Sequence, residues 1–128
     1  MASIQQLPPQ IQSQLAQFQQ IQEQLQVVIQ QRYQLEAQLN EIDRTLEELK
    51  KISKDTTLFK SIGMVLIKVE NKEELEKELE DKKEMLAMRI KTVVRQEETL
   101  KEKHQSLQEK LQSALAQYQG SGGVLGAG

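Results

Sequence analysis

Apolar residues recur along the first half of the chain in alternating steps of three and four, from Leu7 to Leu49. Eleven of the thirteen positions on this register are apolar, and only Gln14 and Arg32 interrupt it. A stripe kept over six heptads is typical of a coiled-coil seam. The pattern therefore predicts a long helix over about residues 9–53, which begins at a Pro-Pro pair suited to a first helical turn.

A second stripe with the same spacing runs through residues 79–118, where nine of twelve positions are apolar. Asn71 stands ahead of this stripe and is a favoured residue for capping the free N–H groups of a helix. The pattern predicts a second helix over about residues 71–118, weaker than the first. Its polar interruptions are Lys83, Glu97 and His104.

The two predicted helices have nearly equal lengths and are joined by a short connector. Such helices most simply fold back on each other as an antiparallel pair within one chain. Residue numbers that face each other then sum to about 125, so Phe18 faces Leu107 and His104 falls near Ile21. Arg32 and Glu97 lie within about one turn of each other in this register, close enough to pair.

The connector, residues 55–70, changes from helical spacing to alternation. Val65, Ile67 and Val69 alternate on one face of a strand, Gly63 supplies a turn, and residues 58–61 make a shorter preceding strand. A lone β-hairpin is marginal in water, and its apolar edges favour pairing with other chains. A hairpin folded onto its own helices is the alternative. The residues expected to drive assembly are Leu58, Phe59, Ile62, Gly63, Val65, Ile67 and Val69.

Charge divides the chain more sharply than apolar content does. Residues 1–22 and 111–128 carry no charged side chain, whereas twenty of the thirty-four residues 70–103 are charged. Glutamine occupies fifteen positions between residues 5 and 38, a composition also found in disordered low-complexity segments. The regularly spaced apolar residues favour a helix here instead.

The chemistry available to the chain is narrow. It has no cysteine and a single histidine, so neither a thiolate zinc site nor a multi-histidine metal site is expected. We expect no catalytic site, no cofactor and no phosphate-binding motif. A net charge of -2 favours neither nucleic acid nor membrane surfaces. No apolar run reaches the length of a membrane span and no secretory signal is evident, so the expected location is the cytoplasm.

Three segments together resemble a known family. The hairpin Phe59-Lys60-Ser61-Ile62-Gly63, set between two equal helices, is the most specific of them. The others are residues 7–12 (LPPQIQ) and residues 95–98 (RQEE). The chain resembles the β-type subunit of prefoldin, most closely the archaeal form and its eukaryotic subunit 6 relative, over nearly its whole length.

This resemblance implies a mainly α fold, with a long antiparallel two-helix coiled coil joined by a central β-hairpin that oligomerises into a β-barrel platform. It implies a single domain. The Gly-rich tail over residues 119–128 is not a strong feature of the family and is expected to be flexible. The resemblance also implies a hexamer of two α-type and four β-type subunits that acts as an ATP-independent holdase. Such a complex captures unfolded client proteins on its coiled-coil tentacles and passes them to a group II chaperonin.

The antiparallel arrangement places the two uncharged ends of the chain together, and this end is the expected client-binding surface. A few exposed apolar side chains bind weakly each, and several arms acting together raise the avidity. The residues expected to contact a client are Ile4, Leu7, Ile11, Leu15, Phe18, Leu107, Leu111, Leu115 and Tyr118.

Three other functions fit parts of the pattern. A structural coiled-coil scaffold or tether would need only the heptads, and the aggregation-prone hairpin argues against it. A helical arm of a nucleic-acid enzyme, such as a tRNA synthetase, would carry a basic stripe in place of the balanced charges of residues 70–103. A lipid-surface helix would carry Lys and Arg on its polar face, unlike the glutamine-rich end.

Overall fold

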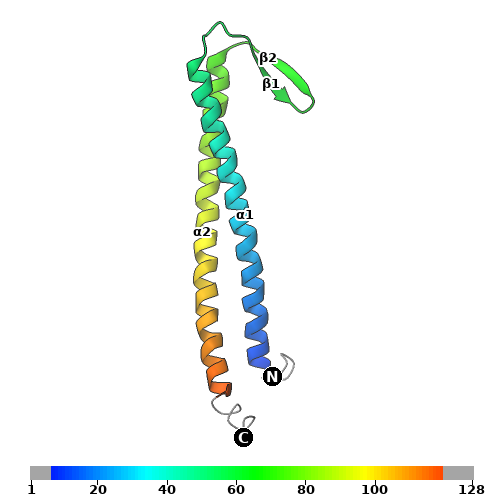
Figure 1. The fold of residues 1–128 in the computed structure, drawn as a ribbon, viewed down its shortest axis with the longest axis vertical. Coiled ribbons are helices and arrows are strands. Elements are labelled where there is room, and N and C mark those ends of the chain that lie inside the picture. The colour runs from blue at the N-terminus through cyan, green and yellow to red at the C-terminus, as the bar shows by residue number, and fades with distance from the viewer. Residues whose placement is uncertain (1–6, 120–128) are drawn as a thin grey trace. The chain divides into compact units, whose positions relative to one another are not determined.

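The computed structural model describes residues 7–119. Helix α1 (Pro9–Lys51) is followed by strands β1 (Leu58–Ile62) and β2 (Val65–Val69) and by helix α2 (Lys72–Tyr118), as Figure 1 shows. Two long helices with a two-stranded antiparallel hairpin between them confirm the predicted fold class. Ile4 and the Gly-rich stretch 120–128 lie outside the described residues.

The chain divides into two compact units. The terminal unit comprises residues 1–30 and 94–128, and the hairpin unit comprises residues 31–93. Each unit contains one stretch of α1 and one stretch of α2, and the hairpin unit also contains both strands.

In the terminal unit, the rings of Phe18 and His104 stack with their centroids 4.5 Å apart and their planes at 27°. Ile11 and Leu111 are both buried in the same unit. This unit joins the start of α1 to the end of α2, as the predicted antiparallel pair requires. The contact of Phe18 with His104 lies about one turn from the predicted register, which placed Phe18 opposite Leu107.

In the hairpin unit, two polar contacts join the antiparallel helices. The Nζ of Lys83 lies 2.7 Å from Oδ1 of Asp43, and the Nζ of Lys72 donates a hydrogen bond of 3.0 Å to the carbonyl of Ile52. The apolar core of this unit is small. Its buried apolar side chains are Leu46, Leu49 and Leu86.

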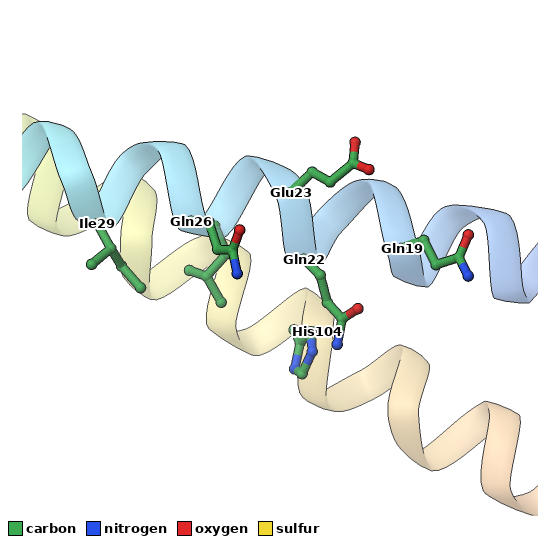
Figure 2. Close-up of a pocket in the computed structure, with 7 residues that line it drawn as sticks. Gln19, Gln22, Glu23, Gln26, Ile29 and His104 are labelled. Atoms are coloured by element: carbon green, nitrogen blue, oxygen red, sulfur yellow. The ribbon is translucent and has the colours of Figure 1, made fainter.

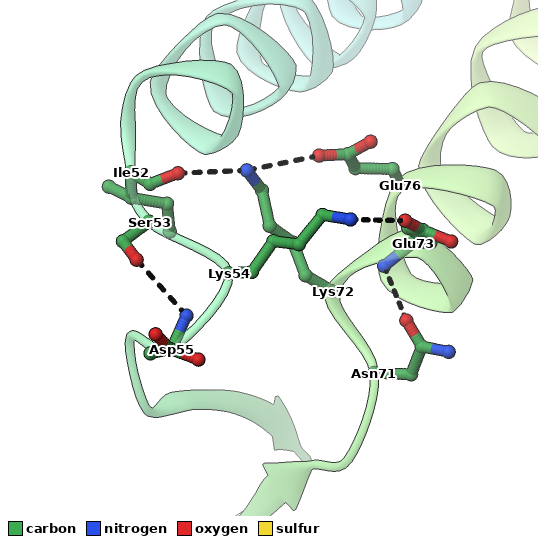
Figure 3. Close-up of polar contacts among 8 residues, drawn as sticks. All are labelled: Ile52, Ser53, Lys54, Asp55, Asn71, Lys72, Glu73 and Glu76. Atoms are coloured by element: carbon green, nitrogen blue, oxygen red, sulfur yellow. Dashed lines mark hydrogen bonds and ion pairs between the residues drawn. The ribbon is translucent and has the colours of Figure 1, made fainter.

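Caps and short-range bonds end the helices where the sequence changes (Figure 3). The Asn71 side chain accepts a 2.8 Å hydrogen bond from the Glu73 amide, as predicted for the start of α2. After α1, the Ser53 hydroxyl accepts a hydrogen bond from the Asp55 amide. The Lys54 ammonium lies 3.6 Å from the Glu73 carboxylate, which joins the two ends of the connector.

The hairpin has equal strands with Ile62 opposite Val65. The predicted first strand is therefore one residue too short, because the loop consists of Gly63 and Met64 alone. Gly63 has a φ of 59°, and none of the described non-glycine residues, Met64 included, has a positive φ. A positive φ at the first loop position alone is the pattern of a type II′ turn, which matches the twist of the flanking strands.

Candidate functional site

Both faces of the hairpin carry apolar side chains. The antiparallel register places Leu58, Lys60 and Ile62 opposite Val69, Ile67 and Val65 on one face, and Phe59 and Ser61 opposite Lys68 and Leu66 on the other. The sheet has two strands only, so both of its edges are unpaired within the described residues. It is therefore an open template for further strands.

Exposure within the hairpin grows toward the turn. Leu58 and Val69, next to the helices, are half-buried. Phe59 and Val65 are each 59% exposed, and Ile62 and Ile67 are also exposed. These exposed residues are not covered by the protein's own helices, as the alternative of a hairpin folded onto its helices would require.

Two apolar hairpin residues were missed by the sequence argument. Leu66 is 70% exposed and Met64 is fully exposed. The argument followed one alternating face of the second strand, and these two residues lie on the opposite face and in the loop. Their place inside one uninterrupted apolar run was the signal that could have found them.

The base of the hairpin is tied to α2 by one charge pair. The Nζ of Lys60 lies 3.4 Å from both carboxylate oxygens of Glu78. Beside this pair is a groove of about 220 Å³. Its apolar lining comes from Ile67, Val69 and Leu75. The pair therefore spans a gap that the hairpin leaves against its own helix.

At the terminal end, the predicted client-contacting residues divide into two groups. Ile11 and Leu111 are each 5% exposed and belong to the seam between the helices. The other described members are half-buried, so each offers part of its side chain to solvent. They are Leu7, Leu15, Phe18, Leu107, Leu115 and Tyr118.

Gln14 creates a weak point in this seam. Its side-chain oxygen Oε1 is buried and has no hydrogen-bond partner among residues 7–119. An unsatisfied buried polar group costs about 1–3 kcal/mol. Gln14 was visible in the sequence as one of two interruptions of the first stripe, although its lack of a partner was not.

The other polar interruptions are paired. Glu97 is buried and lies 3.3 Å from the Lys101 ammonium, and Arg32 lies 3.2 Å from Glu36. Each pair joins two residues that are one turn apart, Arg32 and Glu36 on α1 and Glu97 and Lys101 on α2. The Arg32–Glu97 pairing joins residues of different units and stays a prediction.

Lys83, another polar interruption of the second stripe, is held in its charged form. Its hydrogen bond to Asp43, and then the attraction between the two charges, raises the pKa of the Lys83 ammonium above its ordinary value of 10.5.

A search of residues 7–119 finds no cluster of three or more His, Cys, Asp or Glu side chains able to hold a metal ion. In the same residues, no helix has the length and apolar character to cross a membrane. The arrangement offers apolar and amide surfaces as its means of interaction.

Comparison with known proteins identifies the family that shares this architecture. The family described as "Prefoldin subunit" matches residues 12–118. The chain belongs to the prefoldin family. The prefoldin β subunit of Methanocella arvoryzae is 53% identical over 121 residues, covering 94% of this chain and 95% of that protein. The Archaeoglobus fulgidus prefoldin β subunit is 49% identical over 111 residues, covering 87% and 95% respectively.

A prefoldin fold is also found among solved structures. The crystal structure of the prefoldin β subunit from Thermococcus strain KS-1 matches with a TM-score of 0.77 and 36% identity. The match covers 90% of this chain and 97% of that chain. The resemblance to the β-type subunit is therefore confirmed.

Membership in this family makes the chain a subunit of a chaperone complex that assembles with other prefoldin subunits. It favours a chaperone over the three alternatives of tether, nucleic-acid arm and lipid-surface helix. The two surfaces described above are then candidates for assembly and for client binding.

Proposed function

We propose that this chain is an ATP-independent holdase subunit that captures unfolded proteins at the uncharged end of its terminal unit. The proposal rests on the half-buried apolar side chains of Leu7, Leu15 and Leu115, which lie within the uncharged stretches 1–22 and 111–128. Apolar area on an unfolded chain gains about 25 cal/mol for each Å² that it buries. Because these side chains of the chaperone are only half-buried, part of their apolar area is available to be buried against a client.

Weak contacts suit this role. A half-exposed leucine offers only part of the roughly 1.5–3 kcal/mol that full burial of such a side chain supplies. Binding by one arm is then weak and reversible, and several arms on one complex raise the effective concentration of contacts. No fixed pocket has to match a particular client.

The hairpin supplies the assembly that joins the arms. We propose that its open edges and exposed residues Phe59, Val65 and Ile67 pair with hairpins of α-type and other β-type subunits in a barrel platform. A complex of two α-type and four β-type subunits would carry six arms. Transfer of the client to a group II chaperonin, and a cytoplasmic location, complete the proposal.

The experiment compares a triple leucine variant of the assembled complex with a double charge variant. Leu7→Ser, Leu15→Ser and Leu115→Ser remove half-buried apolar side chains from the terminal end, and we expect protection of a denatured client from aggregation to fall at least tenfold. The loss follows from several contacts of about 1 kcal/mol each, multiplied over the arms. Light scattering with and without ATP measures it, and the parent should act equally in both.

The matched control is Glu76→Lys with Glu80→Lys, a charge change in the hairpin unit. It should leave both assembly and protection close to those of the parent. Equal protection by the leucine variant, with the complex intact by native mass spectrometry, would place client capture elsewhere.

A further inference from the structure

Beside the seam of the terminal unit lies a groove of about 430 Å³ whose rim is made largely of glutamine (Figure 2). Three amides come from α1 and the imidazole of His104 comes from α2. Figure 2 shows Gln19, Gln22 and Gln26 along the same helix, with the end of Gln22 near His104. The lining residues are Gln19, Gln22, Glu23, Leu25, Gln26, Ile29 and His104.

Sequence spacing sets this row of amides. Gln19, Gln22, Gln26 and Ile29 follow each other in steps of three, four and three, which places them on one face of a helix. Each directly follows a seam position of the first stripe. The row therefore runs parallel to the seam along its solvent-exposed flank.

The amides are available for a ligand. Gln19, Gln22 and Gln26 are exposed, and their side chains make no hydrogen bond among residues 7–119. Glu23 is the one acidic residue of the lining, and no Lys or Arg takes part. Apart from Glu23 and His104, the groove is therefore lined by uncharged amide and apolar side chains, and its amides both donate and accept hydrogen bonds.

We propose that this groove binds the main chain of an extended client segment through the glutamine amides. The inference rests on the proposed holdase function and names what its surface recognises. Every non-proline residue of an unfolded chain carries one N–H donor and one C=O acceptor, whatever its side chain. A glutamine amide offers the complementary set, two N–H donors and a carbonyl acceptor.

The dimensions fit such a ligand. The ten helical steps from Gln19 to Ile29 span about 15 Å at a rise of 1.5 Å each. An extended chain of four or five residues covers about the same length at roughly 3.3 Å per residue. Leu25 and Ile29 in the lining then pack against the apolar side chains of the client while the amides hold its backbone.

Other ligands fit the groove poorly. An anion such as a phosphate would face Glu23 without a lysine or arginine partner. A metal ion would need a cluster of ligands that residues 7–119 do not provide. Main-chain recognition is independent of client sequence, as a general holdase requires.

The first test replaces Gln19, Gln22 and Gln26 by methionine, which keeps the length and helix propensity of the side chain but removes its hydrogen bonds. The matched control replaces Gln17, Gln20 and Gln24, on the other flank of the seam. Binding of labelled, reduced and carboxymethylated α-lactalbumin to the assembled complex is measured by fluorescence anisotropy, with helicity checked by circular dichroism.

We expect the groove variant to bind about fivefold more weakly than the parent, the effect of losing roughly one net hydrogen bond, and the control variant to bind at least as tightly as the parent. Capture by apolar contact alone predicts the opposite, since methionine adds apolar surface. Unchanged or tighter binding by the groove variant would overturn the inference. It would leave the holdase proposal standing if the parent still binds.

The second test changes the ligand, so it remains decisive even if the groove variant folds poorly. A labelled twelve-residue peptide of leucine, serine and glycine is compared with one whose four central amides are replaced by esters, which removes their N–H donors. We expect the ester peptide to bind the parent about fivefold more weakly. Equal binding of both peptides overturns main-chain recognition, whereas failure of the parent to bind either the peptides or lactalbumin counts against the holdase proposal itself.

Discussion

The terminal unit and the hairpin unit both leave apolar surface uncovered, but in different ways. In the terminal unit, side chains such as Leu15 and Leu115 are covered in part by the partner helix, and no charge lies within residues 1–22 or 111–128. In the hairpin unit, Phe59 and Val65 are more than half exposed on a sheet with free backbone groups at both edges. Partial burial gives weak contacts that tolerate many partners, while an open sheet gives directional contacts that select a matching strand.

The largest test of this contrast is to destroy the directional surface. Val65→Asp with Ile67→Asp places two carboxylates on one face of β2, and we expect the complex to fall to small species in size-exclusion chromatography. Helicity by circular dichroism should change little, because neither side chain belongs to the buried core of the helices. The same two changes at exposed seam-flanking positions, Val27→Asp and Tyr33→Asp, are the control and should leave the complex intact. A complex that remains large after the hairpin change would contradict assembly through the hairpin.

The contrast between the two units also shows where sequence reasoning succeeds. The spacing of apolar residues predicted both helices, and Asn71 predicted the start of α2. Alternation of apolar residues around Gly63 predicted the hairpin. Each of these features depends on neighbours along the chain. The one-turn shift at Phe18 depends on ring stacking with His104, and the unpartnered Gln14 oxygen depends on what the opposite helix offers. These are packing details that no periodicity encodes. The glutamine groove was not predicted, because the sequence argument considered glutamine only as a possible sign of disorder and followed the apolar positions instead.

A second test sharpens the contrast from the terminal side. Gln14→Leu replaces a half-buried side chain whose buried amide oxygen is unpaired among residues 7–119, so we expect the free energy of unfolding of the terminal unit to rise by about 1–3 kcal/mol. Native-state hydrogen exchange of the amides in residues 11–25 measures the change unit by unit. Exchange in the hairpin unit should be unaffected if the two units open separately.

The control for this test is Gln17→Leu, which adds a leucine at an exposed position without removing a buried amide. It should leave exchange rates nearly unchanged. If both variants slow amide hydrogen exchange to the same extent, the buried oxygen of Gln14 is not a source of instability.

The smallest expected effect concerns the charge pair in the hairpin unit. The raised pKa of Lys83 means that its pairing with Asp43 stabilises the fold at neutral and mildly alkaline pH, and that this contribution is lost as the pH rises through the raised pKa. Lys83→Gln should therefore lower the thermal midpoint slightly at pH 7 and 9, and the difference from the parent should close as the pH passes the raised pKa. The effect is small because both side chains are about two-fifths exposed.

Lys82→Gln, at the exposed neighbouring position, is the control and should show no such pH-dependent difference. A gap between the parent and Lys83→Gln that widens in alkali would contradict a stabilising role for the charged ammonium.

The uncharged surface of the terminal unit also bears on the ionic environment in which the protein works. Dissolved salt screens charges over a Debye length of about 8 Å at physiological ionic strength, and about 3 Å at 1 M. Contacts made through leucine side chains and glutamine amides carry no net charge for the ions to screen. High salt strengthens apolar association when the ions are excluded from protein surfaces. If clients bind at this end as proposed, added salt should not weaken their binding, whereas exposed pairs such as Lys60–Glu78 weaken as salt is added.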